Sequence, residues 1–223
     1  MSAAGGGAAA PAEPGRDCAL CPRLVAYRRD NALKQPDWFN GAVPSFGEED
    51  ARLLIVGLAP GVTGANRTGR PFTGDYAGDL LYETIGDFGF SDGVYDQRLD
   101  DGLSLRGAMI TNAVRCVPPE NKPTPAEIRA CQPHLAARMT ALPRLEAALC
   151  LGKIAHDSVV RTLGGRLAAH PFAHGAAHRL ALPDGRPITV FDSYHCSRYN
   201  TNTGRLTREM FRAVFAQIRE ALG

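Results

Sequence analysis

Four of the six cysteines are spaced as the ligands of one metal centre could be. Cys18 and Cys21 form a C-x2-C pair, and Cys116 and Cys131 follow much later in the chain. A C-x2-C turn lets two thiolates reach one metal, and two further cysteines complete a four-thiolate site. This spacing alone does not separate zinc from an iron–sulfur cluster. It also leaves open that Cys116 and Cys131 are separate buried thiols.

A glycine-dense loop spans residues 57–75, after a buried apolar run and before a segment with helical apolar spacing. Its backbone amides and the start of the following helix could hold an anion or a polarised oxygen. The loop lacks both the G-K-[ST] ending of a Walker loop and the G-x-G-x-x-G pattern of dinucleotide-binding proteins. Asp75 could take part in chemistry or only cap the helix, and Phe72 could bind a ligand or belong to the core.

A second polar loop, residues 192–205, directly follows another predicted strand. It holds an imidazole, hydroxyls, amides and arginines within fourteen residues. The imidazole of His195 titrates close to neutral pH, so at the carboxyl end of a strand it could be catalytic or structural.

Strands and helices must alternate along the chain to position these loops. Apolar runs predict strands at residues 52–58, 108–114, 146–151 and 188–191, and helical spacing predicts helices at 18–30, 75–88, 125–142, 153–163 and 206–222. Thr124 to Glu127 form a capping box with proline at the first helical position. The alternation predicts a single three-layer α/β/α domain with a mostly parallel central sheet of about four strands. Ligands of such sheets bind beyond the carboxyl ends of the strands, where both polar loops begin.

Length and composition bound the class of protein. The chain has 223 residues, 44% hydrophobic and 22% charged, which favours one sizeable globular domain over a fibre or a disordered chain. Residues 1–15 are predicted to be a flexible tail before a domain of residues 16–223. No run could span a membrane and no secretory signal is evident, so we expect reduced cysteines and a cytoplasmic location. The net charge is +2, with a basic C-terminal third that allows a local anionic partner.

Three segments of the chain resemble the motifs of the uracil-DNA glycosylase superfamily, in particular its B-type enzymes, the fifth family. These segments are Gly57-Leu58-Ala59-Pro60-Gly61, Asn66 to Asp75, and Tyr194-His195-Cys196-Ser197. Leu58 and Ala59 stand where other families have an acidic or amide side chain. Their apolar character marks the B-type enzymes and removes the usual water-activating residue. Cys196 stands where many relatives have proline.

The resemblance implies an enzyme that flips uracil out of DNA and hydrolyses its bond to deoxyribose, leaving an abasic site. It implies that Phe72 stacks on the base, Asn112 reads its edge and His195 hydrogen-bonds the oxygen where negative charge develops. Asp75 would orient water or offset the positive charge of the sugar. The apolar first motif predicts a broad substrate range that includes hypoxanthine. Further base-binding residues would be Gly57, Ala59, Pro60, Gly61 and Gly74, and DNA-binding residues would be Arg70, Ser197, Arg198 and Asn200.

The resemblance also identifies Cys18, Cys21, Cys116 and Cys131 with the four ligands of a structural [4Fe–4S] cluster, with zinc as the alternative. The expected partner is damaged DNA, in double-stranded form, and the expected state is a monomer without membrane contact. Two other functions fit the same residues: a non-catalytic iron–sulfur DNA-binding protein on this fold, and a hydrolase of small nucleotides or nucleosides with structural zinc.

Overall fold

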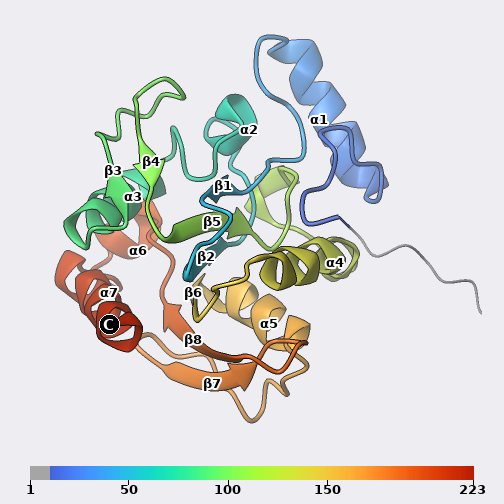
Figure 1. Ribbon diagram of the computed structural model, residues 1–223. Coiled ribbons are helices and arrows are strands. Elements are labelled where there is room, and N and C mark those ends of the chain that lie inside the picture. Colours follow the sequence, from blue (N-terminus) through green and yellow to red (C-terminus); the bar gives the residue numbers. More distant parts are fainter. Residues whose placement is uncertain (1–10) are drawn as a thin grey trace, which may run out of the picture.

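Four parallel strands form the middle of a six-stranded sheet in this computed structural model, which describes residues 11–223 (Figure 1). In spatial order they are β5 (Ala108–Asn112), β2 (Leu53–Gly57), β6 (Ala147–Leu151) and β8 (Pro187–Ser193). Every residue of the first three is buried, as expected for parallel strands covered on both faces. These are the four predicted strands, and the mostly parallel sheet is confirmed.

Two antiparallel strands that the apolar runs did not predict close the sheet at its edges. They are β1 (Phe46–Gly47), which pairs with β5, and β7 (Ala177–Ala181), which pairs with β8. β1 has only two residues, and in β7 exposed residues alternate with half-buried ones. Neither strand contains a run of apolar residues, because an edge strand is covered on fewer sides.

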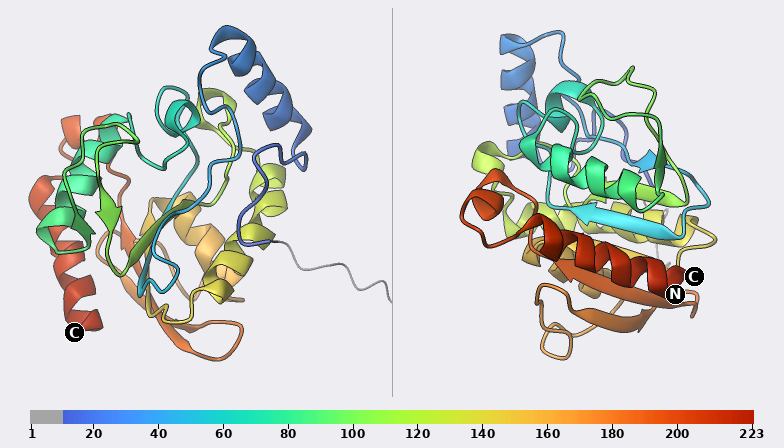
Figure 2. Two further views of the ribbon diagram at one scale, coloured as in Figure 1. Left: turned by 45° about the horizontal axis from the view of Figure 1, so that its top comes forward. Right: turned by 90° about the vertical axis from the view of Figure 1, so that its left-hand side faces the viewer.

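Helices cover both faces of the sheet (Figure 1 and Figure 2). α3 (Tyr76–Asp87) and α7 (Arg208–Leu222) pack on one face with the side chains of Leu53 and Ile55. α4 (Pro125–Ala141) and α5 (Lys153–Thr162) cover the opposite face, where the alternate residues Leu54 and Val56 point. The three-layer α/β/α arrangement is therefore confirmed. The remaining elements are α1 (Pro22–Lys34), α2 (Ala65–Thr68), the hairpin of β3 (Ser91–Asp92) and β4 (Ser104–Leu105), a 3-10 turn (Pro119–Asn121) and α6 (Arg198–Asn202).

The start of α1 differs from the prediction, whereas the start of α4 agrees with it. α1 begins four residues later than predicted, because Pro22 occupies its first turn and Cys21 is an extended N-cap residue. Both cysteines of the C-x2-C pair therefore lie in the turn before the helix. In α4 the Thr124 hydroxyl accepts from the Glu127 amide, and the Glu127 carboxylate accepts from the Thr124 amide at 2.7 Å. The predicted capping box is confirmed.

The last five residues of the predicted tail, residues 1–15, are anchored to the domain; the first ten lie outside the described residues. The His134 ring donates to the carbonyl of Pro11 at 2.7 Å. The carboxylate of Glu13 forms an ion pair with the buried guanidinium of Arg115 at 2.8 Å. The flexible part cannot extend to residue 15 as predicted, because a buried arginine needs this carboxylate as its partner. None of the described helices is long and apolar enough to cross a membrane.

Candidate active site and cysteine cluster

The loops that leave β2, β5 and β8 enclose a cavity of about 350 Å³ at the carboxyl ends of these strands. This is the end at which parallel sheets bind ligands. The cavity brings together nine of the residues selected from the sequence: Ala59, Pro60, Gly61, Phe72, Asp75, Asn112, His195, Ser197 and Arg198. Leu58 and Asn121 also line it. Asn121 was missed, although it lies in the proline-containing loop that follows β5 and has a left-handed φ of 56°.

Gly57, Asn112 and Phe72 meet where β2 ends. A Cβ atom on Gly57 would lie 2.4 Å from the Asn112 Oδ1 and 2.6 Å from the Phe72 Cζ. Gly57 therefore acts by leaving space, which allows the amide and the ring to approach the same point of the backbone. Asn112 is only 3% exposed, so its amide faces the cavity rather than bulk solvent.

Phe72 has an unusual backbone conformation, with a φ of 55°. A bulky residue adopts this left-handed region only where surrounding contacts enforce it. The Phe72 ring lies near the His195 ring, with centroids 6.0 Å apart and planes inclined by 28°. The two rings thus form one aromatic wall of the cavity.

Asp75 occupies the N-cap position of α3 but does not cap the helix with its side chain. Its carboxylate instead lies against Gly61 and Gly64, where an added Cβ would come within 2.8 Å and 2.0 Å of carboxylate atoms. Burial raises the pKa of Asp75, while the Ala65 amide and the charge of Arg67 oppose this shift. The helix-cap alternative therefore does not account for the position of this carboxylate.

Burial lowers the pKa of His195 to about 4, which favours the neutral imidazole at pH 7. Its loop is held from two sides. The Asn200 side chain donates to the His195 carbonyl at 2.8 Å, and the buried Cys196 thiol contacts the Ala77 carbonyl at 3.4 Å. The Cys196 thiol therefore connects this loop to α3. Asn200, predicted to contact DNA, supports His195 in this structure.

A buried polar cluster lies behind the His195 loop. The His156 ring faces the Asp192 carboxylate at 2.7 Å through Nδ1 and the His170 carbonyl at 2.9 Å through Nε2. Because both partners are acceptors, this geometry is that of a protonated imidazole. Although burial lowers the pKa of His156, its bond to Asp192 and that carboxylate's charge raise it above its usual value. His178 also contacts Asp192, at 3.2 Å.

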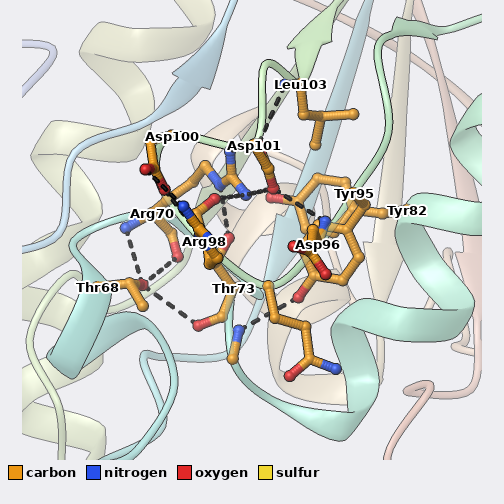
Figure 3. A network of polar contacts seen from close by, with 12 residues as sticks. Thr68, Arg70, Thr73, Tyr82, Tyr95, Asp96, Arg98, Asp100, Asp101 and Leu103 are labelled. Atoms are coloured by element: carbon orange, nitrogen blue, oxygen red, sulfur yellow. Dashed lines mark hydrogen bonds and ion pairs between the residues drawn. The ribbon is translucent and has the colours of Figure 1, made fainter.

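Arg70 is buried, and this corrects the prediction that it contacts DNA. The residue is 4% exposed, and its guanidinium pairs in bidentate geometry with Asp101 at 2.9 and 2.6 Å (Figure 3). The pairing holds the pKa of Asp101 well below its usual range. The guanidinium is therefore committed to an internal carboxylate and cannot reach a phosphate.

The rim of the cavity is formed by the start of α6. Ser197 is the N-cap of this short helix, and its hydroxyl accepts from the Asn200 amide. The exposed guanidinium of Arg198 lies 5.0 Å from the centre of the Tyr76 ring. Tyr199, which sequence reasoning missed, is 71% exposed beside it. An exposed aromatic next to an arginine is suited to contact nucleic acid bases and phosphates.

The four predicted ligand cysteines converge on a second, narrow apolar cleft between α1, α4 and the loop after β5. All four are free thiols, and burial raises the pKa of Cys116 to about 12 and that of Cys131 to about 11. Among the described residues, no three of the cysteine sulfurs lie within 4.8 Å of one another. The four thiols meet at one cleft from three parts of the chain: the turn before α1, the loop after β5 and α4.

Two buried arginines adjoin these thiols. The Arg115 amide donates to the Cys131 sulfur at 3.3 Å, and the charge of Arg28 lowers the pKa of Cys116 against the larger effect of burial. The Nε atoms of both arginines are buried and have no hydrogen-bond partner among residues 11–223. Two arginine side chains beside four thiols supply positive charge that would offset the charge of an anionic metal–thiolate group.

Comparison with known proteins gives one consistent result. The family model described as the uracil DNA glycosylase superfamily matches residues 44–219. A type-5 uracil-DNA glycosylase of Thermus thermophilus is 46% identical over 211 residues, covering 92% of this chain and 94% of that protein. A type-5 enzyme of Pyrobaculum aerophilum is 39% identical, covering 89% and 86% of the two chains. A type-4 uracil-DNA glycosylase of Sulfurisphaera tokodaii is 29% identical, covering 78% and 73%.

Proposed function

Since this chain belongs to the uracil-DNA glycosylase superfamily, and within it to the type-5 enzymes, we propose that it excises uracil from DNA by hydrolysing the N-glycosidic bond. One observation carries the proposal: a single cavity holds an aromatic wall, a buried amide, a neutral imidazole and a half-buried carboxylate. These are the groups needed to stack on a flipped base, read it and stabilise the charges that develop during its release.

The chemistry follows from the positions of four side chains. The ring of Phe72 stacks on the flipped base, and the amide of Asn112 pairs with the Watson–Crick edge. The neutral imidazole of His195 donates a hydrogen bond to the base oxygen on which negative charge accumulates. The carboxylate of Asp75 orients the attacking water or offsets the positive charge that develops on the sugar.

The substrate range extends beyond uracil in this proposal. Leu58 and Ala59 line the cavity with apolar groups, which do not select among hydrogen-bonding patterns as an acidic or amide side chain would. We therefore expect hypoxanthine to be excised as well. Asn112→Asp should change the ratio of uracil to hypoxanthine cleavage, because it replaces the donating half of the amide with an acceptor.

A structural [4Fe–4S] cluster bound by Cys18, Cys21, Cys116 and Cys131 completes the proposal. The cluster would supply no electron to a hydrolysis. By joining α1 to the loop after β5 it would order the segment that carries Asn121 toward the cavity. Four free thiols suit a reducing compartment such as the cytoplasm.

Double-stranded DNA is the proposed form of the substrate, bound by one copy of the chain. Arg198 lines the cavity, and the exposed side chain of Tyr199 follows it in α6, where the strands around a flipped base would pass. Arg198 would hold a phosphate, and Tyr199 would occupy the space that the flipped base leaves.

The test is cleavage of an end-labelled duplex that carries one deoxyuridine, with alkali added to break any abasic site. A product band at the uracil position supports the proposal, and a second duplex with hypoxanthine tests the wider range. Protein that holds its full iron content and binds both duplexes without cleaving either would contradict catalysis and favour a DNA-binding protein on the same fold.

A further inference from the structure

The segment between β3 and β4, residues 93–103, is attached to the loop that carries Phe72. Arg70, two residues before Phe72, forms its bidentate pair with Asp101 of this segment and donates to the Arg98 carbonyl at 2.6 Å. Both members of the ion pair have buried side chains. Figure 3 shows Arg70 in contact with Arg98 and Asp101 of this segment.

Tyr95 reaches from this segment to the backbone on either side of Thr73. Its hydroxyl donates to the Phe72 carbonyl at 3.0 Å and accepts from the Gly74 amide at 3.2 Å. Its ring stacks on that of Tyr82, with centroids 4.4 Å apart (Figure 3). Burial raises the pKa of Tyr95 to about 12, so the hydroxyl keeps the proton that it donates.

These two contacts fall on the part of the loop with the most constrained backbone. Phe72 has a φ of 55° and Gly74 a φ of 83°, so two left-handed residues lie within one turn. Left-handed backbone at a phenylalanine persists only where tertiary contacts hold it. Asp75 follows Gly74 directly, so the direction of its carboxylate depends on the same turn.

We propose that Tyr95 is a positioning residue, whose one hydroxyl sets the geometry of both the Phe72 ring and the Asp75 carboxylate. The proposal rests on the proposed function for the roles of Phe72 and Asp75. Tyr95 itself does not line the cavity, so it acts through the backbone of the turn.

Tyr95→Phe removes the bridging oxygen and keeps the stacked ring. Tyr82→Phe is a matched control, because the Tyr82 hydroxyl belongs to the same stack but donates to the Pro71 carbonyl at 2.6 Å. Amide hydrogen exchange, followed by NMR, tests the contact directly. We expect Gly74 to exchange about 10-fold faster in Tyr95→Phe, while Tyr82→Phe leaves it unchanged. Unchanged exchange at Gly74 in Tyr95→Phe would overturn the proposal.

Single-turnover cleavage of the uracil duplex tests the consequence for catalysis. Tyr95→Phe should lower the maximal rate by about 10-fold, and Tyr82→Phe should lower it by less, because the Tyr82 hydroxyl holds only the Pro71 carbonyl before the turn. In an Asp75→Ala background the effect of Tyr95→Phe should shrink to about 2-fold, because only the Phe72 ring is left for Tyr95 to position. Equal losses in the two backgrounds, or equal losses for the two tyrosine variants, would overturn it. Wild-type protein that cleaves no uracil would contradict the proposed function, and the exchange measurement would still decide the role of Tyr95.

Discussion

Substitution of Gly64 provides a direct test of whether the position of the Asp75 carboxylate matters. A Cβ at residue 64 would lie 2.0 Å from the Asp75 Cγ, whereas ordinary contacts begin at 3.4 Å, so Gly64→Ala must displace the carboxylate by about 1.4 Å. At Gly61 the nearest Asp75 atoms are the two carboxylate oxygens, at 2.8 Å from the added Cβ, which requires a displacement of about 0.6 Å. A misplacement of about 1 Å can cost on the order of 10²-fold in rate. We therefore expect a loss of about 10²-fold for Gly64→Ala and of about 10-fold for Gly61→Ala.

The assay is single-turnover cleavage of a deoxyuridine duplex at saturating enzyme, with thermal unfolding measured in parallel. Gly86→Ala is the control, because it lies in α3 and its Cβ would meet only the Ser91 hydroxyl at 3.5 Å. It should leave the rate unchanged. A Gly64→Ala enzyme as fast as wild type would refute the reasoning, and so would a larger loss for Gly61→Ala than for Gly64→Ala.

Three further predictions concern pH, the cysteines and the buried ion pair. Because the pKa of His195 is about 4 when folded, below its ordinary 6.5, its contribution to stability should be present above pH 6.5 and lost as the pH falls towards 4; urea unfolding should show no such dependence in His195→Gln. Cys131→Ser should lower the iron content and the visible absorbance of the purified protein, and unchanged values would remove Cys131 from the ligand set. Arg70→Ala should destabilise the fold by about 3–5 kcal/mol, because it leaves the buried Asp101 carboxylate without its cationic partner. Weaker DNA binding at unchanged stability would instead restore its predicted contact with DNA.

The sequence by itself predicted those features that depend on local patterns. Apolar runs located β2, β5, β6 and β8, since a strand covered on both faces must be apolar along its length. The Thr124 capping box marked the start of α4, because its bonds join residues only three positions apart. The residues that line the cavity were largely identified by their family motifs and by their place after the strands.

Hydrogen bonds and ion pairs between residues far apart in the sequence could be identified only in the folded chain. Arg70 has the sequence context of a DNA contact, but its partner Asp101 lies 31 residues away, in a segment with no regular pattern. No sequence motif includes Tyr95. Its proposed role follows from the position of its hydroxyl between the Phe72 carbonyl and the Gly74 amide. Periodicity reports which local face is buried; it carries no information on which side chain from elsewhere in the chain meets that face. These partners are set by the packing of the whole core, because buried polar groups are stable only where they form hydrogen bonds or ion pairs.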